Sequence, residues 1–230
     1  GGPPNLKGEH AHPERSDRET INEDVHRRVG HHIIVTTVGA EDFPGSPCSL
    51  LGLSRRDFSS HVRTLIQATD ISARVEEMGA EISRDHRDRE LVVVGVLTGA
   101  FVFMADLVRA LTVPVRCDFL GLSSYGHATR SSGVVSITKD LSSSIEGAHV
   151  LVVEDIVDSG LTMAYLLRNL NTRGPASVRV AALLSKPARR QVEVEVDYVG
   201  FTIEDLFVVG YGMDGRGLYR NLSSIEVLEP

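Results

Sequence analysis

The chain has 230 residues, 42% hydrophobic and 24% charged, which is enough for one sizeable core with extensions. Its net charge of −7 argues against nucleic acid or an anionic membrane as a partner, because no overall positive field attracts them. Two distant cysteines, Cys48 and Cys117, define no disulfide framework, and no apolar run approaches the roughly 20 residues of a membrane span, so we expect a cytoplasmic protein.

The first part of the chain differs in composition from the rest. Residues 1–53 are polar and weakly periodic at first, so we predict an N-terminal extension that is partly flexible and contributes to a small hood. The main domain is expected over 54–230, and one strand, "IIVTTVG", is expected before it. Residues 54–86 show mainly helical spacing, which predicts a helix that can break near Asp70.

From residue 91 onward, short apolar runs alternate with helical patterns. The predicted strands are "LVVVGVL" (91–97), "VRCDFLGLS" (115–123), "VVSIT" (134–138), "HVLVVE" (149–154) and "SVRVAALLS" (177–185), the predicted helices cover 100–111 and 161–174, and a polar loop lies near 124–133. Strands that are apolar on both faces and separated by helices are typical of a sheet buried on both sides. We therefore predict an α/β fold: a mostly parallel twisted sheet with helices on both faces, plus a small hood from terminal segments.

The stretch "EDIVDSGLT" (154–162) follows one of these strands directly. In open α/β sheets, ligands bind beyond the carboxyl ends of the strands, and the amides of 158–162 open a helix that can face a phosphate. Glu154 and Asp155 can accept hydrogen bonds from two vicinal hydroxyls or hold a divalent cation, and Asp158 can act as a general base. Helix capping is the simpler explanation, but a single acid would suffice for it. A sugar phosphate with a proton to lose nearby accounts for all these groups.

The longer segment "VLVVEDIVDSGLTM" closely resembles the phosphoribosyl-pyrophosphate signature of the type I phosphoribosyltransferases, in the wording of their 6-oxopurine (hypoxanthine-guanine) branch. The resemblance runs from about residue 54 to 228. It implies that the sugar phosphate is held by Ile156, Val157, Asp158, Ser159, Gly160, Leu161 and Thr162. It also implies that Asp158 is the base, with Glu154 and Asp155 on the ribose hydroxyls or on metal-bound water.

Two further loops carry the same resemblance. "LTGA" (97–100) is similar to the family's pyrophosphate loop, which contains a non-proline cis peptide, although Thr98 replaces the usual lysine beside Gly99 and removes its side-chain contact. "DFLGLSSYGHATRSSGVVSI" resembles the long flexible catalytic loop, here about 124–137. Its Ser124-Tyr125 pair would close over the site and exclude water.

The base-binding residues are also inferred from the resemblance. Lys186, in "ALLSKPARR", corresponds to the lysine that donates to the 6-oxo group of the purine. In the base-binding segment, about 198–220, Phe207 would stack on the base, and the backbone of Val208 would read its edge. Asp214 would associate with magnesium, and Arg220 would contact pyrophosphate.

The implied reaction joins hypoxanthine or guanine to phosphoribosyl pyrophosphate, giving a purine nucleoside monophosphate and pyrophosphate. Mg²⁺ is the implied cofactor, with Glu154, Asp155 and Asp214 as its candidate ligands, and the family forms homodimers and homotetramers. A xanthine-preferring transferase is the main alternative, since Arg216 in the unusual "MDGRG" segment can supply a donor to the 2-oxo group. A non-catalytic regulatory protein on the same fold is a more remote alternative.

Overall fold

The computed structural model describes residues 1–2, 62–124 and 135–228. The chain separates into two units, Gly1–Leu51 and Gly52–Pro230, and the described elements belong to the second. The strand expected at "IIVTTVG" lies outside the described residues. The elements are β1 (Val62–Ile66), α3 (Ala68–Asp85), β2 (Leu91–Leu97), α4 (Phe101–Ala110), β3 (Val115–Ser124), β4 (Val135–Lys139), β5 (His149–Val157), α5 (Leu161–Asn171), β6 (Ser177–Ser185), the 3₁₀ turn η1 (Pro187–Arg189), β7 (Tyr198–Thr202), β8 (Val208–Val209) and β9 (Ile225–Leu228).

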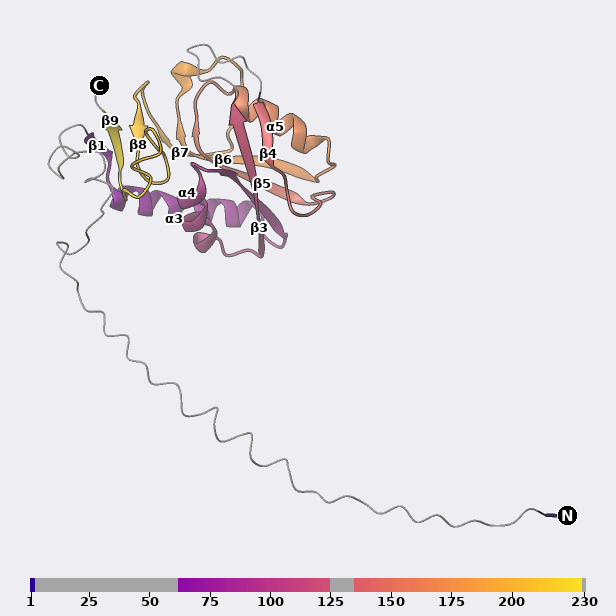
Figure 1. The fold of residues 1–230 in the computed structure, drawn as a ribbon. Helices are drawn as coiled ribbons and strands as arrows, with labels where there is room; N and C mark the ends of the chain where they lie inside the picture. The colour runs from indigo at the N-terminus through magenta and orange to yellow at the C-terminus, as the bar shows by residue number, and fades with distance from the viewer. Residues whose placement is uncertain (3–61, 125–134, 229–230) are drawn as a thin grey trace, which may run out of the picture. The chain divides into compact units, whose positions relative to one another are not determined.

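Six of the strands form one sheet in the order β4-β3-β2-β5-β6-β7, with β4 antiparallel and the other five parallel (Figure 1). From β2 the chain passes through α4 to β3 on one side, while β5 lies on the other side of β2. The order of strands therefore reverses between β2 and β5. In open α/β sheets, ligands bind at the carboxyl ends of the strands at this type of reversal.

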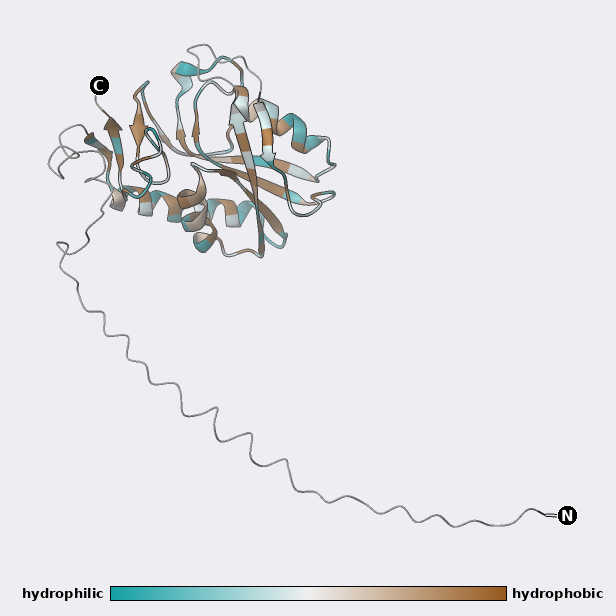
Figure 2. Ribbon diagram, in the orientation of Figure 1, coloured by the Kyte–Doolittle hydropathy of each residue, from teal (hydrophilic) through white to brown (hydrophobic). Residues whose placement is uncertain are grey.

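Alternate residues of the central strands face two different helical layers. Leu91 and Val93 of β2 belong to the core beneath α3 and α4, whereas Val92 and Val94 belong to the core beneath α5. Figure 2 shows the hydrophobic colour concentrated on the central strands and the hydrophilic colour on the outer turns of the helices. The predicted α/β fold, with helices on both faces of a mostly parallel sheet, is confirmed.

A second, smaller sheet has the order β1-β9-β8 and is antiparallel (Figure 1). Its strands come from the beginning and the end of the described unit, so the predicted small hood from terminal segments is confirmed, while the contribution predicted for residues 1–53 lies almost entirely outside the described residues. The single helix predicted over 54–86 is wrong, because residues 62–66 are strand β1 and the helix begins only at Ala68. Val62 pairs with Leu228, and local helical spacing carries no information about a partner so far along the chain.

Helix α3 is nevertheless continuous through Asp70, without the break that the sequence allowed there. It buries Ile71, Val75, Met78 and Ile82 along one face, which is the spacing of an amphipathic helix. Gly79 allows α4 to approach closely, since a Cβ built there would lie 2.5 Å from the Cβ of Ala110. Within the described ranges, no helix is long and apolar enough to cross a membrane.

Candidate active site

Strand β5 continues three residues further than predicted, to Val157, so two of the acidic side chains lie within the sheet. Glu154 pairs with Ala182 of β6, and Val157 pairs with Ser185. The predicted end of the strand at residue 154 was wrong because hydrogen bonding to β6 outweighs the low strand preference of acidic residues. Glu154 and Asp155 are therefore fixed by the rigid sheet.

Both of these carboxyl groups are destabilised as anions. Burial raises the pKa of Glu154 well above its usual range, and the adjacent charge of Asp155 raises it further. Its Oε2 atom is buried and has no hydrogen-bond partner within the described part of the chain. Burial also raises the pKa of Asp155, to about 6, against the opposing effects of nearby backbone amides and Arg220. A ligand that brings hydroxyl donors or positive charge would satisfy both groups.

The loop after β2 lies directly against Asp155. A Cβ built on Gly99 would lie 1.8 Å from Oδ2 of Asp155, so any larger residue would have to displace this carboxylate. The Leu97–Thr98 peptide bond is cis, as the resemblance implied, and the Thr98 side chain is exposed. Gly212, at φ +98°, packs closely against Gly99, since a Cβ there would lie 2.3 Å from the Gly99 carbonyl oxygen. The loop after β2, the carboxyl end of β5 and the loop around residue 212 thus meet at one point.

The turn between β5 and α5 forms a small cavity of about 90 Å³ at the start of the helix. It is lined by Glu154, Ile156, Val157, Asp158, Ser159, Gly160, Thr162 and Met163. Gly160 has φ +83° and precedes the helix, and the Leu161 amide donates to Ser159 Oγ at 3.4 Å. The first amides of a helix lack intrahelical partners and favour an anion, so the cavity is suited to a phosphate group.

The loop between β8 and β9 carries the predicted Asp214 and Arg220. Arg220 donates to Asp214 Oδ1 at 2.5 Å and to the carbonyl oxygen of Gly212 at 2.6 Å. Asp214 Oδ2 accepts a hydrogen bond from the Gly217 amide at 2.7 Å. The charges of both Asp214 and Arg220 affect Asp155, which places this loop beside the carboxylates of β5.

These carboxylates have the oxygen chemistry that Mg²⁺ prefers, and Mg²⁺ sites in phosphate-binding enzymes use only one or two carboxylates together with substrate oxygens and water. Among residues 62–124 and 135–228, no three His, Cys, Asp or Glu side chains come close enough together to hold a metal alone. Carboxylates of this kind could hold a Mg²⁺ ion only together with substrate oxygens and water.

The predicted base-binding residues lie at the same edge. Lys186 is only 7% exposed, and its Nζ donates to the carbonyl oxygen of Leu206 at 2.6 Å. The neighbouring Phe207 is 59% exposed, which is unusual for a large apolar side chain and leaves its ring available for stacking. Gly215 lies beside this ring, since a Cβ there would be 3.6 Å from Phe207 Cε1.

The backbone of Val208 faces the open edge of the small sheet. The Leu228 amide donates to Phe207 O at 3.0 Å, and Val208 pairs with Val227. Hydrogen-bonded and non-hydrogen-bonded pairs alternate along an antiparallel ladder, so Val208 belongs to a non-hydrogen-bonded pair. The Val208 amide and carbonyl therefore point away from β9. Because β8 is an edge strand, no other strand covers them on that side, and the edge of a base could bind there.

Two site features remained unpredicted or untested. Arg189, to which the sequence analysis gave no role, donates from Nε to Asp158 Oδ1 at 3.2 Å and also pairs with Asp205. Tyr125 lies outside the described residues, as does the Ser124 side chain, although the backbone of Ser124 ends β3. The closing of the Ser124-Tyr125 loop stays a prediction.

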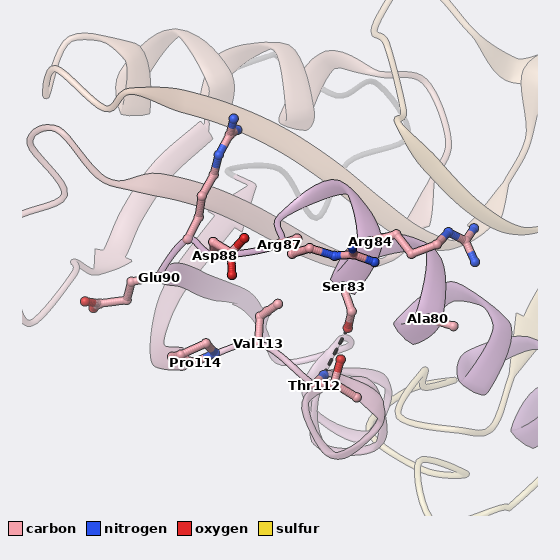
Figure 3. A pocket seen from close by; sticks show the side chains of 10 residues that line it. Ala80, Ser83, Arg84, Arg87, Asp88, Glu90, Thr112, Val113 and Pro114 are labelled. Carbon is pink, nitrogen blue, oxygen red and sulfur yellow. Dashed lines mark hydrogen bonds between the residues drawn. The ribbon is translucent and has the colours of Figure 1, made fainter.

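A larger cavity, of about 670 Å³, lies at the opposite edge of the sheet (Figure 3). It is lined by the last turns of α3, the turn that follows this helix and the segment 112–114, and the Thr112 amide donates to Ser83 Oγ at 3.0 Å. The size of a cavity does not locate the chemistry, because the destabilised carboxyl groups and the phosphate-sized cavity lie at the other edge.

Comparisons with known proteins agree with this geometry. Residues 61–216 match the model of the phosphoribosyl transferase domain. The chain is 50% identical over 172 residues to a hypoxanthine-guanine phosphoribosyltransferase of Mycobacterium avium, covering 72% of this chain and 85% of the relative. It is 45% identical to that of Bacillus subtilis over 168 residues, covering 73% and 93%. A crystal structure of a hypoxanthine phosphoribosyltransferase from Staphylococcus aureus matches with a TM-score of 0.72 and 42% identity, covering 75% of this chain and 94% of that one.

The chain therefore belongs to the phosphoribosyltransferase family. Within this family, its sequence and fold are similar to those of hypoxanthine and hypoxanthine-guanine phosphoribosyltransferases. The resemblance recognised in the sequence is confirmed.

Proposed function

We propose that this protein is a purine salvage enzyme that transfers the 5-phosphoribosyl group from phosphoribosyl pyrophosphate to hypoxanthine or guanine, giving IMP or GMP and pyrophosphate. The observation that carries the proposal is the contact between Gly99 and Asp155. It brings the loop after β2 against the ribose-binding carboxylates of β5, so that one substrate can span a pyrophosphate site and a phosphate site. The identities to the enzymes of M. avium and B. subtilis support the choice of substrates.

Each end of phosphoribosyl pyrophosphate has a matching group. The amides at the start of α5 bind the 5′-phosphate, and Ser159 and Thr162 add hydroxyl donors. Glu154 and Asp155 accept hydrogen bonds from the ribose hydroxyls, which supplies the missing partner of Glu154 Oε2. The backbone at Thr98 and Gly99, together with Arg220, binds the pyrophosphate group.

Mg²⁺ is part of this proposal, with Glu154, Asp155 and Asp214 as candidate ligands, and when bound it neutralises charge on the pyrophosphate leaving group. Burial disfavours the charged form of both β5 carboxyl groups, and Glu154 Oε2 has no hydrogen-bond partner among the described residues until substrate and cation arrive. The same carboxylates face the ribose, where positive charge develops in the transition state, and they stabilise it.

The purine is held between the hood and the sheet. Lys186 donates to the 6-oxo oxygen, the ring of Phe207 stacks on the base, and the backbone of Val208 reads its edge. Asp158 takes the proton from the ring nitrogen as that nitrogen bonds to C1′. The Ser124-Tyr125 loop closes over the complex and keeps water away from the reaction centre. A cytoplasmic location and a homodimer or homotetramer complete the proposal.

A spectrophotometric assay with phosphoribosyl pyrophosphate and Mg²⁺ tests the function, with hypoxanthine, guanine, xanthine and adenine offered separately. Turnover of hypoxanthine and guanine is expected. Turnover of xanthine alone would replace the proposal with a xanthine-preferring enzyme in which Arg216, exposed in the turn beside Phe207, donates to the 2-oxo group. Binding of phosphoribosyl pyrophosphate without turnover of any base would indicate a regulatory protein.

A further inference from the structure

Arg189 lies between two carboxylates at the carboxyl edge of the sheet. Its Nε donates to Asp158 Oδ1 at 3.2 Å, and its Nη1 lies 3.2 and 3.4 Å from the two oxygens of Asp205. The side chains of Arg189, Asp158 and Asp205 are 47%, 39% and 54% exposed. Ion pairs this exposed contribute little to folding stability, so the arrangement is not explained by a need to stabilise the fold.

The two partners of Arg189 belong to different parts of the site. Asp158 lies three residues before the start of α5 and lines the phosphate cavity. Asp205 immediately precedes Leu206 and Phe207 in the sequence. The carbonyl oxygen of Leu206 accepts the hydrogen bond from Lys186. Arg189 therefore links the proposed general base to the segment that holds the purine.

The adjacent Arg190 binds the backbone of Asp158, whereas Arg189 binds its carboxylate. Arg190 Nη1 donates to the carbonyl oxygen of Asp158 at 3.1 Å, and its Nη2 donates to Ser185 Oγ at 3.0 Å. The Gln191 amide also donates to the Ser159 carbonyl oxygen at 2.9 Å. Because these bonds hold the backbone of the turn, the contact with Arg189 acts on the Asp158 carboxylate alone.

We propose that Arg189 is a positioning residue for the general base, an inference that rests on the proposed function. It holds Oδ1 of Asp158 so that the second oxygen, Oδ2, is presented to the ring N–H of the purine. In the reaction the nitrogen–C1′ bond forms, pyrophosphate leaves with the electrons of its bond to C1′, and the ring proton passes to Asp158. The guanidinium stays protonated throughout, since arginine is not deprotonated in proteins.

Asp205 has a separate part in this arrangement. When Asp158 accepts the proton it loses its negative charge, and a guanidinium paired only with Asp158 would lose its counterion at that moment. The second pair with Asp205 remains, so Arg189 keeps both its charge balance and its position. The carboxylate of Asp158 is thus oriented by a group whose own place does not depend on the protonation of Asp158.

Three variants test this arrangement. Arg189→Gln, which keeps a polar side chain but removes the guanidinium cation, should lower kcat for hypoxanthine about tenfold, because misorientation of a reacting group lowers the rate. KM for phosphoribosyl pyrophosphate should stay within about twofold, since the phosphate cavity is intact. Asp205→Asn should lower kcat by about threefold, and the double variant should be no slower than Arg189→Gln, because both changes break one linked arrangement.

The matched control is Arg173→Gln. Arg173 pairs with Asp140 at 2.7 Å, a comparable surface ion pair between the end of α5 and the segment after β4. Its removal should leave kcat and KM unchanged.

The pH dependence separates positioning of the base from a general structural effect. At alkaline pH, where the purine loses its ring proton in solution, no general base is needed, so the deficit of Arg189→Gln should disappear. An unchanged kcat at pH 7, or the same deficit at every pH, would overturn the role of Arg189. If the unmodified enzyme turns over none of the bases, the proposed function itself fails, which the assay with wild-type protein shows separately.

Discussion

The amino and carboxyl ends of the parallel strands, called here the amino edge and the carboxyl edge of the six-stranded sheet, surround their charged groups with opposite environments. At the amino edge, Tyr198 donates to Asp85 Oδ2 at 2.8 Å, and Arg179 donates to the same oxygen at 2.7 Å and to the Tyr198 hydroxyl at 2.6 Å. The hydrogen bond from Tyr198 holds the pKa of Asp85 below its usual range. At the carboxyl edge, burial raises the pKa of Asp155 to about 6.

This difference separates a structural network from a binding site. Asp85, Arg179 and Tyr198 satisfy one another, whereas Glu154 at the carboxyl ends of the strands keeps a buried oxygen without a hydrogen-bond partner among the residues described. The other buried atom of this kind, Arg116 Nε at the amino end of β3, lies 3.7 Å from Glu90 Oε1. Natural proteins tolerate few such atoms, and a ligand that supplies the missing partner is one reason for them. Substitutions at the carboxyl edge should therefore change activity, and those at the amino edge should change stability.

Removing the proposed base should give the largest effect. Asp158→Asn is expected to slow turnover by about 10²–10⁴-fold, the range of general-base catalysis, while binding of phosphoribosyl pyrophosphate is kept. Steady-state kinetics and a direct binding measurement would check this. Turnover at the wild-type rate would remove Asp158 from the role of base.

Filling the contact between the loop after β2 and strand β5 should have the next largest effect. In Gly99→Ala the new methyl group must displace the Asp155 carboxylate, and misplacement of about 1 Å costs on the order of 10²-fold in rate. Gly79→Ala is the matched control, because its methyl group meets Ala110 between α3 and α4, away from the site. The control should lower the melting temperature and keep kcat, and the same result for Gly99→Ala would contradict the proposed contact.

Asp155→Asn should increase stability while it removes activity. The folded-state pKa of Asp155, about 6, lies above the ordinary 3.8, so the folded protein binds the extra proton between these values. The contribution of this group to the free energy of unfolding therefore falls as pH rises from about 4 to about 6. Asn cannot ionise, so the variant should be more stable by about 1–3 kcal/mol at pH 7. Urea unfolding at pH 4 and pH 7 measures this difference, and an equal stability change at both values would refute it.

The smallest effect is expected at the amino edge. Tyr198→Phe removes a buried hydroxyl that bonds Asp85 and Arg179, which should cost about 1–2 kcal/mol of stability. Because Asp85 and Arg179 remain paired and lie away from the site, kcat should not change. Denaturant unfolding and the turnover assay together test this, and a fall in kcat would show that the two edges are coupled.

Parts of the fold were predictable because local sequence determines them. The bounds of β2 and β6, Leu91–Leu97 and Ser177–Ser185, agree with the prediction, since strands buried on both faces leave continuous apolar runs. Strand β1 was not predictable in this way, because its partner β9 lies at the other end of the unit. Pairing across such a distance leaves no periodic signal in either segment.

The site was predictable to a similar extent. Glu154, Asp155 and Asp158 are adjacent in sequence, so a single motif brings them together. The contact of Gly99 with Asp155 depends on the parallel pairing of β2 with β5, which only the fold shows. The pairing of Arg189 with Asp205 was missed, although two consecutive arginines just after Lys186, beyond a strand's carboxyl end, were a usable signal.

Strand β9 is the middle strand of the small sheet, and it holds both β1 and the edge strand β8. During synthesis the amino-terminal parts of a protein emerge first and can fold first. Ile225–Leu228 leave the ribosome after every strand of the large sheet, so the proposed sugar-phosphate half of the site can form before the proposed purine half. A chain that lacks these four residues would keep the strands of the parallel sheet but lose the β9 partner of Val208.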